Sequence, residues 1–192
     1  MNKLWATGAL CAMTIIATPA VAEQINIPAL QAEGKTVIKA LANELGGELK
    51  KAAKASGLDG AIQVCNTKAM PITARISATK GWIISRTSLK LRNPNNAPDN
   101  WEKGVLELFG KQASAGANLQ KMAFSQVMMN DEGQKVFRMM KAIPVGDQCL
   151  ACHGSQLKPA VASKLDALYP TDHARGFTAG DLRGAFSLQK VL

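Results

Sequence analysis

Histidine and aromatic side chains are scarce in this 192-residue sequence, which contains two histidines, one tyrosine and only 5% aromatic residues. With so few histidines, general acid–base catalysis has few candidate groups, and no catalytic constellation is visible, so we do not expect an enzyme. Long apolar runs are absent after the N-terminal segment, so we expect no membrane span there. The sequence also lacks repeats, low-complexity tracts and nucleic-acid-binding motifs, and we expect no nucleic acid as a partner.

The single long apolar run lies at the N-terminus and is typical of a cleaved signal peptide. Lys3 supplies a basic start, residues 4–17 are mostly apolar, and Ala20-Val21-Ala22 is a small-x-small cleavage site. The run is shorter than a bilayer span requires, and Pro19 interrupts its end. We therefore predict a signal peptide over 1–22 with cleavage after Ala22, a periplasmic location, and one domain over 23–192.

Positive charge exceeds negative charge, and the number of cysteines in the mature chain is odd. The formal net charge is +9, or +8 without Lys3, which favours acidic partners, a membrane surface or anionic groups on a ligand. Many of the lysines are also typical of a solvated helix face. Cys11 leaves with the signal peptide, so Cys65, Cys149 and Cys152 remain. In an exported protein, one disulfide and a spare thiol is the simplest interpretation of three cysteines.

Hydrophobic periodicity predicts helices in the first part of the mature chain. Apolar residues recur at three- and four-residue steps over 33–55, which predicts a long amphipathic helix that Gly46-Gly47 weakens and bends. A second helix over 59–69 places Cys65 on its inward face, and a third, short helix follows over 71–76.

Alternating patterns predict strands in the second part. The strand-like stretches are 83–92, 119–129, 135–143 and 183–192. The second and third flank turn residues 130–133 and form an antiparallel hairpin, while Asp99 or Asn100 caps a helix between the first and second. Residues 159–180 contain two turn-rich stretches, which predicts a surface excursion. This order indicates an α+β domain around an antiparallel sheet.

The motif that carries chemistry is Cys149-Leu150-Ala151-Cys152-His153, the pattern of c-type haem attachment. In this pattern two thiols add to the haem vinyl groups, and the adjacent histidine ligates the iron. The sequence therefore predicts one covalently attached haem c, bound through Cys149 and Cys152, with His153 as the proximal iron ligand. Alternatives are a redox disulfide pair and a zinc site that Cys65 and His173 complete.

A six-coordinate haem needs a second axial ligand, for which several residues are candidates. These are Cys65, His173, Met128, Met129, Met139 and Met140. Methionines in strands more often fill a core, and an inward cysteine is often an inert buried thiol. Arg86, Lys90 and Arg92 share one face of the predicted strand and are candidates for binding the haem propionates, the alternative being an exposed basic face.

Three segments of the chain resemble a known family. They are Val64-Cys65, the run from Gly81-Trp82 to Trp101-Glu102, and Cys149 to Gly154 together with Gly180 to Ser187. The resemblance is to the c-type haem-binding sensor domains with a PAS-like fold, first described as a domain of unknown function in bacterial signal transducers. It implies a five-stranded antiparallel sheet with flanking helices, and a haem ligated by the motif histidine and by a cysteine, here Cys65 as the distal ligand.

Two functions follow from these expectations, with two further alternatives. The first is a periplasmic monohaem c-type cytochrome that acts as a redox or gas-responsive sensor, in which oxidation state or a diatomic gas displaces Cys65 and changes the surface seen by a signalling partner. The second is an electron-transfer cytochrome that presents a basic face to an acidic redox partner. A haem enzyme and a zinc-binding protein are the remaining alternatives.

Overall fold

The computed structural model describes residues 24–192, so the predicted signal peptide, 1–22, lies outside the described residues. Its first element is a long helix, α1, Ile27–Thr67, whose N-terminus is capped where the Asn26 side chain accepts a hydrogen bond from the backbone N–H of Ala29. The prediction of a long N-terminal helix is confirmed. The predicted bend at Gly46-Gly47 is wrong, because the irregular backbone lies at Ser56 and Gly57, where Gly57 adopts a φ of 63°.

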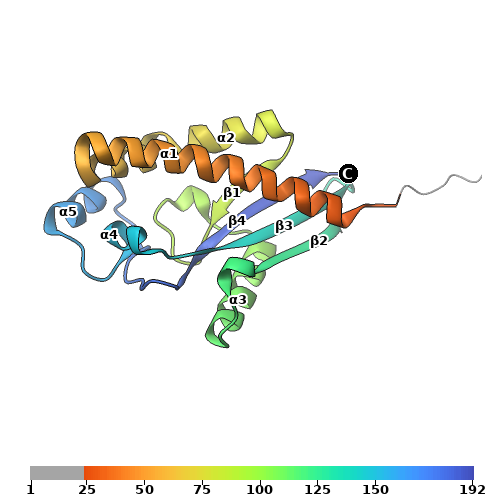
Figure 1. Ribbon diagram of the computed structural model, residues 1–192. Helices are drawn as coiled ribbons and strands as arrows, with labels where there is room; N and C mark the ends of the chain where they lie inside the picture. The colour runs from red at the N-terminus through yellow and green to blue at the C-terminus, as the bar shows by residue number, and fades with distance from the viewer. Residues whose placement is uncertain (1–23) are drawn as a thin grey trace, which may run out of the picture.

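A second helix lies beside α1 and leads into the sheet. This helix, α2, Ala69–Lys80, begins directly after α1 and ends at Gly81, which adopts the left-handed conformation with a φ of 64°. Figure 1 shows α1 and α2 side by side along the sheet. Their inward residues form one core: Leu41 and Leu45 from α1 and Ile72 from α2 are buried against the strands.

The sheet has four antiparallel strands in the order β1-β4-β3-β2. Their bounds are β1, Ile83–Thr87; β2, Ala123–Met129; β3, Lys135–Pro144; and β4, Leu182–Val191. The hairpin and the last strand are confirmed. The prediction of five strands is wrong for residues 24–192, because the remaining segments form helices and turns rather than a further paired strand.

The first strand is also shorter than its alternating sequence predicts, and it ends at Thr87 instead of residue 92. The side chain of Ser88 redirects the chain at this point. Its hydroxyl donates to the carbonyl of Arg183 at 2.7 Å and accepts from the backbone N–H of Lys90 at 3.1 Å. Side-chain bonds to the backbone compete with the strand ladder, so the alternation continues in sequence while the pairing stops.

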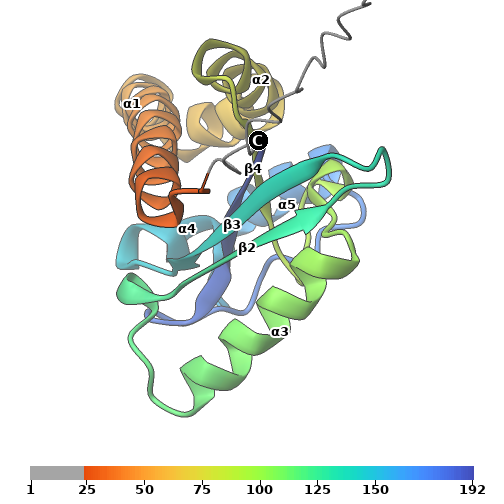
Figure 2. The same ribbon diagram turned by 90° about the vertical axis from the view of Figure 1, so that its right-hand side faces the viewer.

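Helices cover both faces of the sheet (Figure 2). On the face opposite α1 and α2 lies α3, Asn100–Ser114, which begins with a capping box between Asp99 and Glu102. Successive residues of a strand point to opposite faces. Met139 is accordingly buried in the core beneath α1, and Met140 in the core beneath α3. The mixed α+β architecture is thus confirmed.

The segment over 159–180 is more than a surface excursion. It begins with a helix, α5, Pro159–Leu168, and it then contributes the buried residues Tyr169, Ala174 and Phe177. Val161 and Leu165 are spaced four residues apart after Pro159, which is a helical signal, but the turn-rich residues around this short helix outweighed it in the sequence-based prediction. Among residues 24–192, no helix combines the length and the apolar character that crossing a bilayer requires.

Candidate functional site

The Cys-x-x-Cys-His motif forms a tight helical turn near one end of the sheet. Cys149 ends a 3-10 turn that begins at Asp147, and a one-turn helix, α4, Leu150–His153, follows at once. Cys149 and His153 are four residues apart and therefore lie on the same side of this turn. Both line one pocket. Cys152 instead packs against the small apolar cluster between α1 and α5.

Backbone hydrogen bonds attach the motif to the loop that precedes β4. The N–H of Gly176 donates to the carbonyl of Gly154 at 3.1 Å, and the N–H of Phe177 donates to the carbonyl of His153 at 3.0 Å. A side chain at position 154 is excluded, because its Cβ would lie 2.6 Å from the Leu150 carbonyl oxygen. Glycine after the motif therefore allows the tight turn.

The pocket beside the motif has a volume of about 440 Å³. That volume lies within the range of roughly 300–1,000 Å³ that small-molecule and cofactor sites occupy. Leucines of α1 that are spaced four residues apart form an apolar wall, and they are Leu41, Leu45 and Leu49. Cys65 comes from the last part of α1 and His153 from α4, so residues remote in sequence meet in the same pocket.

His153 is held in one orientation and in one tautomer. Its Nδ1 lies 2.7 Å from the carbonyl oxygen of Ala174, and because a carbonyl only accepts, Nδ1 carries the hydrogen. Burial, together with the positive charges of Arg183 and Arg92, lowers the pKa of His153 to about 3. The imidazole is therefore neutral at pH 7, with a lone pair on Nε2, which is the form that binds a metal ion.

The thiol of Cys65 lines the same pocket. Burial raises the pKa of this thiol, and the positive charge of Arg86 partly offsets that increase. The neighbouring positive charge does not outweigh burial, so Cys65 favours the neutral thiol unless a metal ion is bound beside it.

Other candidates for the axial position lie elsewhere or have a different role. Met139 and Met140 are buried in the two cores, and Met129 is exposed at the end of β2. The side chain of His173 is exposed. Met70 does line the pocket, although the sequence patterns did not single it out as a candidate axial ligand.

Neither a multidentate metal site nor a disulfide is present among residues 24–192. The described part of the chain contains no group of three or more His, Cys, Asp or Glu side chains arranged to hold a metal ion. The zinc alternative, which needed Cys65 and His173 to join the motif cysteines, gains no support from this geometry. The three described cysteines are unpaired.

Three arginines converge on the pocket from different elements. Arg86 lies in β1, Arg92 in the following loop and Arg183 in β4. Burial lowers the pKa of Arg86, and burial together with the charge of Arg92 lowers the pKa of Arg183 to about 10. Within residues 24–192, the buried Nε atoms of Arg86 and Arg92 have no hydrogen-bond partner. Asp172, which pairs with Arg92 at 3.1 Å, supplies one negative charge to this cluster.

An excess of buried positive charge is costly unless an anion neutralises it. The pocket therefore fits a ligand that has an apolar body and more than one anionic group. A haem matches this description, since its ring is apolar and its two propionates are carboxylates, which guanidinium groups bind well.

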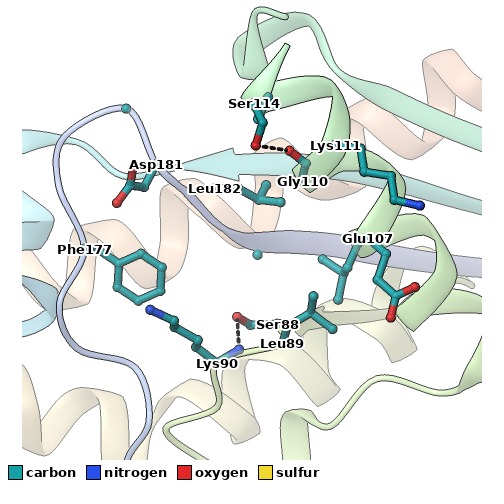
Figure 3. A pocket seen from close by; sticks show the side chains of 14 residues that line it. Ser88, Leu89, Lys90, Glu107, Gly110, Lys111, Ser114, Phe177, Asp181 and Leu182 are labelled. Carbon is teal, nitrogen blue, oxygen red and sulfur yellow. Dashed lines mark hydrogen bonds between the residues drawn. The ribbon is translucent and has the colours of Figure 1, made fainter. Parts of the chain in front are cut away.

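Lys90 does not lie with Arg86 and Arg92. Its side chain is exposed, and its Nζ lies 5.0 Å from the centre of the Phe177 ring. Figure 3 shows it in a second pocket, of about 890 Å³, between α3 and the ends of β1 and β4. The turn at Ser88 separates Lys90 from the predicted basic face, and Ser88 and Gly184 line both pockets.

The sequence patterns missed Arg183, Asp172 and Tyr169, all of which lie at the site. Arg183 and Tyr169 line the pocket, and Asp172 anchors Arg92. Arg183 follows Asp181-Leu182 and begins the predicted last strand. This position beside a turn, at the end of a strand, was a sequence signal that could have identified Arg183 as a site residue. Tyr169 continues the four-residue spacing of Val161 and Leu165, whereas Asp172 belongs to no such period, and both lie in the segment predicted as a surface excursion.

The fold and the site define an α+β domain with a Cys-x-x-Cys-His turn beside an apolar pocket rich in arginine. The family model Tll0287-like matches residues 7–190, and the chain belongs to the Tll0287-like family. The chain is similar to a solved structure, "Crystal structure of the cyanobacterial heme-protein Tll0287". The TM-score is 0.57 at 25% sequence identity, and the match covers 85% of this chain and 95% of that chain. No curated protein matches the chain.

Proposed function

We propose that this chain is a periplasmic c-type cytochrome with one covalently attached haem, and that it acts as a redox or gas-responsive sensor. The observation that carries the proposal is that Cys65 lines one pocket with Cys149 and His153, although it is remote from them in the sequence. Membership of a family that includes a protein named as a heme-protein supports the choice of cofactor. The signal-like N-terminal sequence supports the periplasmic location, where such attachment takes place.

In this proposal each residue of the motif has a defined task. Cys149 and Cys152 form the two thioether bonds, and His153 provides Nε2 as the proximal ligand while Nδ1 stays bonded to the Ala174 carbonyl. Cys65 provides its sulfur as the second axial ligand. Arg86 and Arg92 bind the propionates, as the sequence predicts, and Arg183 replaces Lys90 in that role because it lines the same pocket.

When bound, the haem supplies an iron whose potential and ligand affinity depend on its axial ligands. The surroundings of Cys65 favour a sensor. Thiolate suits ferric iron better than ferrous iron, and burial raises the pKa of the Cys65 thiol and so favours its neutral form, so Cys65 would hold a ferrous iron less firmly. A weaker Cys65 ligand would leave the reduced iron open to a diatomic gas.

The first experiment tests covalent attachment. Protein exported in cells with a cytochrome c maturation system is denatured, and its intact mass is measured. We expect the mass of the chain without residues 1–22 plus one haem, and a loss of attached haem in Cys149→Ala/Cys152→Ala. A mass that matches polypeptide alone would overturn the proposal, and a retained N-terminal segment would overturn the cleavage at Ala22.

The second experiment tests the axial ligands. We expect a low-spin ferric spectrum with sulfur-to-iron charge transfer, which Cys65→Ser removes while raising the reduction potential. Met70→Leu is the matched control, because Met70 lines the same pocket and offers the other kind of sulfur. If Met70→Leu changes the spectrum and Cys65→Ser does not, the ligand is methionine.

The alternative function is electron transfer, favoured by the excess of basic residues that would attract an acidic redox partner. Carbon monoxide added to the reduced protein distinguishes the two functions. Binding supports the sensor, whereas a reduced form that stays six-coordinate and binds no gas supports the carrier. A PAS-like relationship and the absence of enzymatic activity are further parts of the proposal, supported by the helix-covered antiparallel sheet and the lack of a catalytic constellation.

A further inference from the structure

The carboxylate of Asp172 forms no hydrogen bond with His153, but it is linked to it through the backbone of Ala174. Asp172, in the loop after α5, has a side chain that is only 2% exposed. Its Oδ2 accepts from Arg175 Nε at 2.8 Å and lies 3.1 Å from Arg92 Nη2, while its Oδ1 accepts from the backbone N–H of Ala174 at 2.9 Å. This single side chain therefore holds two arginines and one backbone amide.

The residue that Asp172 holds is also the hydrogen-bond partner of His153. The Ala174 carbonyl accepts from His153 Nδ1 at 2.7 Å and from Arg92 Nη2 at 3.3 Å. The same Arg92 nitrogen donates to the Cys152 carbonyl at 2.6 Å. An Nη atom has two hydrogens, so three acceptors share them: the Asp172 carboxylate and the carbonyls of Ala174 and Cys152.

We propose that Asp172 is a positioning residue for His153. It holds Ala174 by its backbone N–H, and it competes for the Arg92 hydrogens, so that Arg92 makes only a long bond of 3.3 Å to the Ala174 carbonyl and the imidazole makes the shorter one of 2.7 Å. The inference rests on the proposed function, in which His153 is the proximal ligand.

The consequence concerns how strongly His153 donates electrons. A ring N–H that is strongly bonded to an acceptor makes the other ring nitrogen a more basic ligand. Stronger donation favours ferric over ferrous iron, so Asp172 lowers the reduction potential through the Ala174 carbonyl. Loss of its charge releases Arg92 toward that carbonyl, weakens the bond from His153 and raises the potential.

The test compares Asp172→Asn with Asp166→Asn in the haem-bound protein. Both variants remove one negative charge that pairs with Arg175, but Asp166 has a side chain that is 67% exposed, and its partner is Arg175 rather than Ala174 or Arg92. We expect Asp172→Asn to shift the ferric-to-ferrous equilibrium by roughly tenfold, or about 59 mV upward for one electron, and Asp166→Asn to shift it much less.

Nuclear magnetic resonance of the His153 Nδ1–H separates positioning from simple charge removal. We expect faster solvent exchange and a shifted resonance for this proton in Asp172→Asn alone. A raised potential with an unchanged Nδ1–H would overturn the inference, because charge alone would then account for it. Equal shifts in both variants would do the same.

If Asp172→Asn cannot be obtained with haem bound, a measurement on the unaltered protein tests the inference instead. The backbone amide of Ala174 should be protected from hydrogen exchange, since its acceptor is the buried Asp172 carboxylate. An unprotected Ala174 amide would refute the positioning role. These outcomes differ from a failure of the proposed function, in which the unaltered protein contains no covalent haem or keeps its spectrum in His153→Ala.

Discussion

Replacement of Arg92 by alanine should show how strongly the buried ion pair holds the site together. The side chains of Arg92 and Asp172 are 10% and 2% exposed, and their nearest nitrogen and oxygen atoms are 3.1 Å apart. Arg92 also donates to the Cys152 carbonyl at 2.6 Å. Arg92→Ala therefore removes the links between the loop after β1, the loop after α5 and the Cys-x-x-Cys-His motif.

The expected loss of stability follows from what remains after the substitution. Removal of one partner from a buried ion pair costs about 3–5 kcal/mol, because the other charge stays buried without compensation. Asp172 keeps its bond from Arg175 at 2.8 Å, so we expect the lower end of that range, about 3 kcal/mol. For a chain of this size, that loss corresponds to a fall in Tm of about 6–12 °C.

Urea unfolding of the haem-bound protein measures the effect, with Arg75→Ala as the control. Arg75 pairs with Glu44, but these side chains are 56% and 32% exposed, so the pair contributes at most about 1 kcal/mol. If Arg92→Ala loses no more free energy of unfolding than Arg75→Ala, the assignment of a buried stabilising pair is wrong. If the m values of the two variants differ, the variants expose different amounts of surface on unfolding, and their free energies are not directly comparable.

Three further predictions test the packing and the electrostatics of the site. Gly184→Ala should lower the free energy of unfolding by about 1–3 kcal/mol, because its Cβ would lie 2.2 Å from the Thr87 carbonyl oxygen; an unchanged Tm would contradict this close approach. Gly104→Ala in α3, where the described residues leave space for a Cβ, should instead stabilise the protein by about 0.5–1 kcal/mol in the same thermal assay. Burial by itself would raise the pKa of Asp172, but hydrogen bonds from Arg92 and Arg175 lower it overall. The stability contributed by Asp172 should therefore be present above its unfolded pKa of about 3.9 and be lost as the pH falls through the folded pKa, and Asp172→Asn should flatten this acid dependence in urea unfolding.

Local chemistry made several elements predictable from the sequence. The spacing of Val37, Leu41 and Leu45 specifies an inward helical face, since residues three and four apart lie on one side of a helix. The turn over 130–133 joins two alternating stretches, and Asp99 with Glu102 begins α3 through a capping box. Each of these signals depends on neighbours within a few residues, so no knowledge of the tertiary structure is needed to interpret it.

The limits of these local signals are equally specific. Alternation continues to residue 92, but strand pairing ends at Thr87 because the Ser88 hydroxyl bonds to the backbone instead. The Gly46-Gly47 pair remains helical within the long α1, whereas Gly57 adopts a positive φ and permits the irregular backbone. The low helix propensity of glycine is only a weak preference, and packing against the rest of the chain decides at which glycine the helix becomes irregular.

The sequence by itself determined the reactive groups of the candidate site. The adjacency of Cys149, Cys152 and His153 is encoded in five consecutive residues, and their relative positions within one helical turn follow from that spacing. The tertiary structure alone decided which groups face them. Arg183 rather than Lys90 joins Arg86 and Arg92. Pairing of β1 with β4 brings Arg183 to the pocket, while the turn at Ser88 directs Lys90 away from it. Such contacts depend on strand register and on packing between segments remote in sequence, and a local sequence period contains no information about either.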